Sequence, residues 1–162
     1  MNTENFTAKV SVLFVCMGNY CRSPAAEAFA KYLVKKKGIS HLFHIESAGT
    51  HNYHEGQTPD PRMQKEAEGR GYILSDIKGR SFQSQDLKKF QYILAMDKRN
   101  LDDLATITRQ ASAKRAELIL KYTSLPMTEV PDPYYSNRVG FSNSLDLIEA
   151  GVSAFIKFAT EK

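Results

Sequence analysis

Cysteine is scarce in this sequence, with two among 162 residues, at positions 16 and 21. So few cysteines exclude a fold held by a disulfide framework and favour a reducing, cytoplasmic compartment. Long hydrophobic runs are also missing, since no apolar stretch approaches the ~20 residues that span a bilayer. Residues 1–7 are polar and lack the basic-then-apolar order of a signal peptide. We therefore expect a cytoplasmic protein with no membrane span.

A strong charge of one sign is absent as well. The formal net charge is +4, and the 22 lysine and arginine residues are scattered along the chain. A mild positive excess suits anionic substrates, but without a basic cluster it does not indicate nucleic-acid binding. His41, His44, His51 and His54 have no ligand spacing with cysteines or carboxylates. We therefore predict that these histidines face solvent and that the protein binds no metal.

Internal repeats and low-complexity tracts are missing too, and the composition is that of an ordinary globular protein. Of the 162 residues, 42% are hydrophobic and 25% are charged, so the chain can bury a substantial core. We expect residues 1–8 to be a flexible lead-in and residues 9–162 to form a single domain.

Short apolar runs alternate along the chain with segments of helical periodicity. The runs, rich in β-branched and aromatic residues, predict strands at residues 9–15, 43–47, 92–96 and 116–120. Helical spacing and capping residues predict helices at residues 24–37, 62–68, 85–89 and 141–159, and another that Asp97 caps. This alternation predicts an α/β fold with a four-stranded parallel sheet and helices on both faces. Its ligands should bind beyond the carboxyl ends of the strands, near the first one.

A short polar loop separates the first predicted strand from the first predicted helix. Cys16 and Arg22 lie six positions apart in it, Gly18 occupies the turn, and Ser23-Pro24 is a helix-start signal with serine as the N-cap. A loop wrapped over a helix N-terminus directs backbone N–H groups and the positive end of the helix dipole at one point, where an oxyanion fits. Arg22 can bind two oxygens of that anion with its planar fork. The same donors favour the thiolate form of Cys16.

The segment Cys-Met-Gly-Asn-Tyr-Cys-Arg-Ser-Pro, placed directly after a hydrophobic strand, resembles the phosphate loop of the low-molecular-weight protein tyrosine phosphatases. The resemblance spans nearly the whole chain, and Asp-Pro-Tyr-Tyr at residues 132–135 is similar to the family's general-acid loop. It implies that Cys16 is the nucleophile, that Arg22 clamps the phosphate and that Asp132 is the general acid and base. It also implies supporting or substrate-binding positions at Met17, Gly18, Asn19, Tyr20, Cys21, Ser23, Ser47, Tyr53 and Tyr134.

Together these residues predict phosphate-ester hydrolysis without a metal or cofactor. The Cys16 thiolate attacks phosphorus and Asp132 protonates the leaving phenolate, which leaves a cysteinyl-phosphate; Asp132 then takes a proton from the water that hydrolyses it. The Ser23 hydroxyl is placed to hydrogen-bond the sulfur. The family's pattern implies a hydrogen bond between Ser47 and the loop asparagine. A further hypothesis is that Cys21 forms a reversible disulfide that protects the nucleophile from overoxidation.

Two positions depart from the family's pattern. Where the family often has a histidine followed closely by an arginine, this chain has Asp76 and Arg80, and we assign Asp76 no role in bracing the loop. The loop residue before the second cysteine is a threonine in family members that act on phosphoarginine and a larger apolar residue in those that act on phosphotyrosine. This chain has Tyr20, whose bulk favours a flat aromatic ester.

The expected partners are therefore phosphotyrosine-containing proteins, and the expected state is a monomer or weak dimer. Phosphoarginine hydrolysis stays open as an alternative. Arsenate reduction is less favoured, because no resolving cysteine lies outside the loop. A non-catalytic phosphate-binding module is also less favoured, because such a protein would usually have lost Cys16, Arg22 or Asp132.

Overall fold

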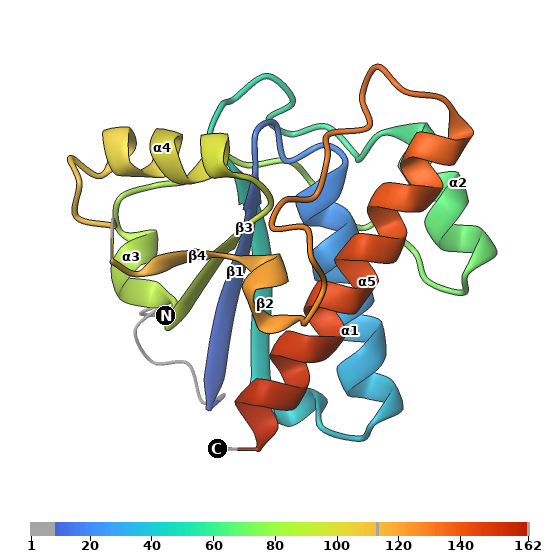
Figure 1. Ribbon diagram of the computed structural model, residues 1–162, viewed down its shortest axis with the longest axis horizontal. Coiled ribbons are helices and arrows are strands. Elements are labelled where there is room, and N and C mark those ends of the chain that lie inside the picture. Colours follow the sequence, from blue (N-terminus) through green and yellow to red (C-terminus); the bar gives the residue numbers. More distant parts are fainter. Residues whose placement is uncertain (1–8, 113, 162) are drawn as a thin grey trace.

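The computed structural model describes residues 9–112 and 114–161, so the predicted lead-in at residues 1–8 lies outside the described residues. Strands and helices alternate along the chain (Figure 1). The strands are β1 (Val10–Cys16), β2 (Phe43–Gly49), β3 (Tyr92–Ala95) and β4 (Ala116–Leu118). The α-helices are α1 (Arg22–Lys36), α2 (Pro61–Gly69), α3 (Asp86–Lys89), α4 (Lys98–Ile107) and α5 (Arg138–Thr160), and the 3-10 helices are η2 (Ser40–Leu42) and η3 (Ile119–Tyr122).

The four strands form one parallel sheet in the order β2-β1-β3-β4. The central strand β1 pairs with β2 through Val12 opposite Ile45, and with β3 through Val12 opposite Tyr92. Since all strands point the same way, the loops after β1, β2 and β3 leave the sheet at one edge. The predicted four-stranded parallel α/β fold is confirmed.

Side chains of β1 alternate between two buried clusters, which explains why this strand is apolar at nearly every position. Leu13 and Val15 pack on one face with Leu104 of α4, while Val12 and Phe14 pack on the other face with residues of α1 and α5. In Figure 1, α1, α2 and α5 lie on one side of the sheet and α3 and α4 on the other. None of the described helices is long and apolar enough to cross a membrane.

Several element boundaries differ from the sequence predictions. Helix α1 begins at Arg22, so the prediction of Ser23 as its N-cap is wrong: Cys21 occupies that position and Ser23 lies in the first turn. The fourth strand ends at Leu118, and residues 119–122 turn into η3. Helix α5 starts three residues earlier than predicted, because the Asn137 side chain accepts a hydrogen bond from the backbone N–H of Gly140 and caps it.

Candidate active site

The phosphate loop connects the end of β1 to the first turn of α1 and holds Cys16 at its base. The Cys16 side chain is buried, with Sγ 3.4 Å from the Ser23 backbone nitrogen, which donates to it, and 3.0 Å from Ser23 Oγ. The Ser23 oxygen accepts a hydrogen bond from Asn19 Nδ2 at 2.8 Å, and its single hydroxyl proton lies within reach of the sulfur at 3.0 Å and of the Ala48 carbonyl at 3.4 Å. Ser23 thus contacts the Cys16 sulfur through both its backbone N–H and its hydroxyl and does not cap the helix.

Asn19 braces the loop from within and lies in the left-handed region, with φ of 53°. Its Nδ2 also donates to Ser47 Oγ at 3.0 Å, the hydrogen bond that the resemblance implied, and Ser47 in turn donates to the buried Glu27 at 2.6 Å. Its Oδ1 accepts the backbone N–H of Arg80 at 3.0 Å. Both ends of this buried amide are therefore satisfied, which holds the loop in one conformation.

Asp76, which stands where the family often has a histidine, does not brace the phosphate loop. Asp76 is exposed and makes no hydrogen bond within the part of the chain that the structure describes. The backbone N–H of Arg80 instead donates to Asn19 Oδ1 and braces the loop. The Arg80 guanidinium forms ion pairs with Asp86 at 3.0 Å and with Glu46 at 3.2 Å. Burial alone would lower the pKa of Arg80, but these carboxylates outweigh it and raise the pKa, so the cation persists. A main-chain donor thus completes the Asn19 network.

Arg22 is almost completely buried, and its fork is oriented by partners far away in the sequence. Its Nη1 donates to Asp97 Oδ2 at 2.7 Å and to the Val130 carbonyl at 2.9 Å. Burial opposes its charge, but the negative charge of Cys16 and the hydrogen bond to Asp97 outweigh that effect and raise the pKa of Arg22. Nε and Nη2 make no hydrogen bond to residues 9–112 or 114–161. These two parallel donors match two oxygens of a bound phosphate.

Asp97 therefore has a second function that the sequence did not reveal. Its side chain caps α4 as predicted, in a capping box with Asn100. The other carboxylate oxygen binds Arg22, and Asn100 is fully buried below. The sequence predicts only a helix cap at Asp97, because no local pattern distinguishes a cap from a cap that also orients an arginine.

Asp132 lies at the mouth of the same site, on the segment between η3 and α5. Its Oδ2 is 3.6 Å from Arg22 Nη2, and its Oδ1 accepts the backbone N–H of Tyr134 at 3.0 Å. The segment is anchored on both sides, since the Val130 N–H donates to the Met96 carbonyl and Ser144 Oγ donates to the Pro131 carbonyl. This anchoring holds an exposed carboxyl group above the phosphate site.

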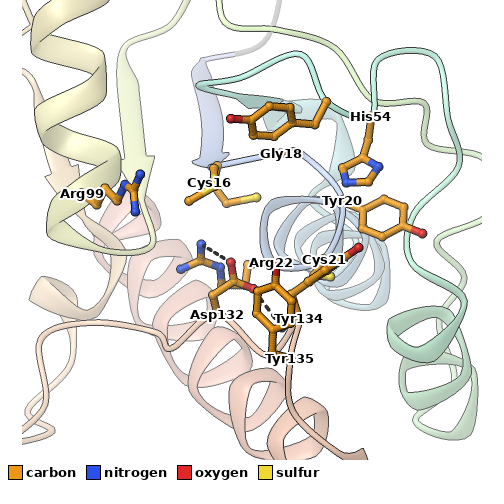
Figure 2. Close-up of a pocket in the computed structure, with 12 residues that line it drawn as sticks. Cys16, Gly18, Tyr20, Cys21, Arg22, His54, Arg99, Asp132, Tyr134 and Tyr135 are labelled. Carbon is orange, nitrogen blue, oxygen red and sulfur yellow. Dashed lines mark hydrogen bonds and ion pairs between the residues drawn. The ribbon is translucent and has the colours of Figure 1, made fainter.

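One cavity of about 520 Å³ unites these residues (Figure 2). Tyr20 and His54 form its aromatic wall, stacked with ring centroids 3.7 Å apart, and the Tyr134 ring lies 6.2 Å from Tyr20. Burial, followed by the nearby Asp60, raises the pKa of Tyr20, so the ring stays neutral. The lining residues are Cys16, Met17, Gly18, Tyr20, Cys21, Arg22, Tyr53, His54, Arg99, Asp132, Tyr134 and Tyr135. The wall is suited to a flat aromatic ring.

The structure corrects the prediction that all four histidines face solvent. His41 is exposed, but His54 lines the cavity, and His44 and His51 are half-buried against Glu46 and Asp103. No spacing rule marks His54, because its place in the cavity wall arises from its stacking on Tyr20, 34 positions earlier in the sequence. Sequence reasoning also missed Arg99, a cavity residue from α4. Among residues 9–112 and 114–161, no three His, Cys, Asp or Glu side chains gather as a metal site.

The two cysteines of the loop differ in environment. Cys21 Sγ donates to Asp60 Oδ2 at 3.5 Å, and burial, followed by the charge of Asp60, raises the pKa of the Cys21 thiol. Cys21 is therefore held in the thiol form, whereas Cys16 faces the hydrogen-bond donors of Ser23. The geometry makes Cys16 the candidate nucleophile of the pair.

Peroxide treatment tests the disulfide hypothesis for Cys21. Peroxide oxidises the Cys16 thiolate to a sulfenic acid, and attack by Cys21 sulfur forms the S–S bond and releases water. We expect inactivation of the parent to be reversed by added thiol, with most activity recovered, and recovery to fall several-fold in Cys21→Ser because oxidation then continues to the sulfinic acid. Activity is measured after peroxide and dithiothreitol, and mass spectrometry counts the added oxygens. Equal recovery in the two proteins would refute the protective role.

A parallel α/β sheet with a Cys-x5-Arg loop at the end of its central strand, and an aspartate above the arginine, defines a cysteine-dependent phosphatase. A family model described as low molecular weight phosphotyrosine protein phosphatase matches residues 11–162. The chain belongs to this family, which makes it a hydrolase.

Individual relatives agree. The human low molecular weight phosphotyrosine protein phosphatase is 40% identical over 136 residues, which cover 83% of this chain and 85% of the relative. The structure of a protein tyrosine phosphatase from Entamoeba histolytica superposes with a TM-score of 0.87 at 38% identity, covering 94% of this chain and 97% of the other. A Drosophila arginine phosphatase superposes with a TM-score of 0.83 at 31% identity, covering 91% and 96%.

Proposed function

We propose that this protein hydrolyses phosphotyrosine in proteins, and small aryl phosphates, through a cysteinyl-phosphate intermediate. The observation that carries the proposal is the placement of Cys16 Sγ, the Nε and Nη2 side of the Arg22 fork and the Asp132 carboxyl around one cavity. Phosphoprotein substrates follow from the family. The reduced cysteine pair suits a cytoplasmic location, and the proposed state is a monomer or weak dimer.

The proposed reaction proceeds in two displacements. The Cys16 thiolate attacks phosphorus while Arg22 and the backbone N–H groups of residues 17–22 hold the three equatorial oxygens. Asp132, protonated, gives its proton to the tyrosine oxygen as the P–O bond breaks. The carboxylate then removes a proton from water, which attacks the intermediate and releases phosphate and the Cys16 thiolate. The Ser23 hydroxyl stabilises the departing sulfur.

The cavity wall supports phosphotyrosine over phosphoarginine. Tyr20 and His54 stack on each other, and with Tyr134 they line the cavity with aromatic surface against which a flat leaving group can pack. One structural neighbour is an arginine phosphatase, so the fold accommodates either activity. Arsenate reduction has no support, because the chain has no third cysteine to receive a disulfide.

The proposal is tested by phosphate release from a phosphotyrosine peptide and from phosphoarginine, without added metal. We expect the phosphotyrosine peptide to be preferred by a factor of ten or more, about 1.4 kcal/mol in transition-state binding. A preference for phosphoarginine would retain the mechanism and change the substrate class. Failure of the folded, reduced protein on both substrates would contradict an enzymatic function.

Replacement of Asp132 tests the general acid by its dependence on the leaving group. Asp132→Ala should lower kcat for the phosphotyrosine peptide by roughly 10²–10⁴-fold, because tyrosine leaves poorly without a proton. The loss should be much smaller for p-nitrophenyl phosphate, whose leaving group is stable as an anion. The two kcat ratios are compared between parent and variant, with Asp76→Ala, an exposed carboxyl outside the cavity, as the matched control. Equal losses on both substrates would exclude the role as proton donor.

A further inference from the structure

Arg99 lines the active-site cavity, yet the proposed reaction gives it no function. It lies in the first turn of α4, whose start is fixed by the capping box of Asp97 and Asn100. In Figure 2 its guanidinium is directed toward the cavity from the α4 side, across Cys16 from the aromatic wall. Its backbone is therefore held beside the site, while its side chain reaches the mouth.

No residue that the structure describes neutralises the charge of Arg99. The side chain is exposed and has no ion pair or hydrogen bond to any residue in 9–112 or 114–161. Three of the nearby carboxylates already have partners, whereas Asp102, three residues after Arg99 in α4, is exposed and forms no ion pair with a described residue. Asp97 binds Arg22 at 2.7 Å, Asp103 lies 3.3 Å from His51 Nε2, and Glu129 accepts the backbone N–H of Lys98 at 2.7 Å.

The other two arginines near the cavity, unlike Arg99, form ion pairs within the protein. Arg22 serves the phosphate, and Arg62 pairs with Asp60 at 2.7 Å and lies over the Phe141 ring at 4.6 Å. The phosphate oxygens already have donors from the loop and Arg22, so a second arginine at the opposite rim is available for another part of the substrate. When the ring of the substrate phosphotyrosine packs against Tyr20 and His54, the peptide on either side of it must extend out of the cavity over its rim.

We propose that Arg99 is a specificity-determining residue that binds the carboxylate of an aspartate or glutamate flanking the phosphotyrosine. This inference rests on the proposed function. An arginine fork matches a carboxylate with two parallel hydrogen bonds, and the rigid start of α4 limits the entropy lost on binding. The one carboxylate that lines the cavity is Asp132, which is required for chemistry. Acidic peptides are therefore the favoured substrates.

The test uses phosphotyrosine peptides of equal length that carry Glu, Gln or Lys at the positions flanking the phosphotyrosine on both sides. The parent, Arg99→Gln and Arg99→Glu are compared by kcat/KM at low salt, with Lys98→Gln as control. That control removes the same charge from the neighbouring residue, which does not line the cavity. Thermal unfolding midpoints and p-nitrophenyl phosphate rates are recorded for each protein.

We expect the parent to prefer the Glu peptides over the Gln peptides by roughly fivefold to twentyfold, as for a solvent-accessible charged hydrogen bond. Arg99→Gln should remove this preference, Arg99→Glu should reverse it toward the Lys peptides, and Lys98→Gln should keep it within about twofold. An unchanged Glu:Gln ratio in Arg99→Gln overturns the inference. So does an equal loss on every substrate, p-nitrophenyl phosphate included, because Arg99 would then act on the phosphate itself.

The failure of the inference can be told apart from the failure of the proposed function. A parent enzyme that hydrolyses aryl phosphates with no preference for acidic peptides overturns the Arg99 inference alone. A folded, reduced parent that is inert toward every phosphate ester overturns the proposed function, and the inference with it.

Discussion

Replacing Cys16 by serine should abolish turnover, with kcat lower by on the order of 10⁴–10⁶-fold, as for other enzymes that lose their nucleophile. The physical reason is the state of the attacking atom. The reacting form of cysteine is the thiolate, and the Ser23 N–H donates to the sulfur at 3.4 Å, whereas a serine hydroxyl at this position would stay protonated and attack phosphorus poorly. No described histidine contacts Cys16 to remove that proton, so the oxygen cannot replace the thiolate.

Binding should survive the same change. Arg22 and the loop N–H groups are unaffected in Cys16→Ser, so the affinity for inorganic phosphate should stay within about tenfold of the parent. Turnover is followed by phosphate release, and binding by calorimetry or by protection against thermal unfolding. Cys21→Ser, the same substitution in the same loop, should lose far less activity. Activity of Cys16→Ser above one part in about a thousand would contradict a thiolate mechanism.

Replacing Arg22 by lysine should lower kcat/KM by on the order of 10³-fold although the charge is kept. Arg22 uses Nη1 for Asp97 and the Val130 carbonyl, and it has Nε and Nη2 left for phosphate. A lysine ammonium is a single compact donor centre, so it cannot hold these partners and also offer a fork to the phosphate. The loss should be largest in the transition state, where charge on the phosphoryl oxygens is bound most tightly.

Lysine is chosen at this position because it preserves folding better than alanine does. Arg22→Ala would leave the Asp97 carboxylate without its cation in a largely buried site, at a cost of about 3–5 kcal/mol in stability. The kinetic constants of Arg22→Lys are compared with those of Arg62→Lys, which alters an arginine that pairs with Asp60 and does not line the cavity, and should cost less than about tenfold. Thermal unfolding monitors the fold of both. A kcat/KM of Arg22→Lys within tenfold of the parent value would show that a positive charge alone suffices to bind the phosphate in the transition state.

The parts of this protein that depend on neighbours in sequence could be predicted from it. The order of strands and helices follows from local periodicity, and the Cys16-to-Arg22 loop is a motif of seven residues whose geometry is set by a tight turn over a helix start. Asp132 could be assigned because prolines on both sides fix its backbone and because the segment resembles a known loop. Element ends were less certain: Ser23 suits an N-cap, but the sulfur beside it uses its hydroxyl instead.

The sequence by itself therefore determined the class of fold, the phosphate loop and the candidate nucleophile, because these rest on local patterns of a few residues. Tertiary structure alone decided which distant residues serve that loop. Asp97 and Val130, 75 and 108 positions after Arg22, orient its fork, and His54 and Arg99 enter the cavity from separate segments. The physical reason is the parallel sheet, which brings the carboxyl ends of its strands to one edge, where loops far apart in sequence line a single cavity.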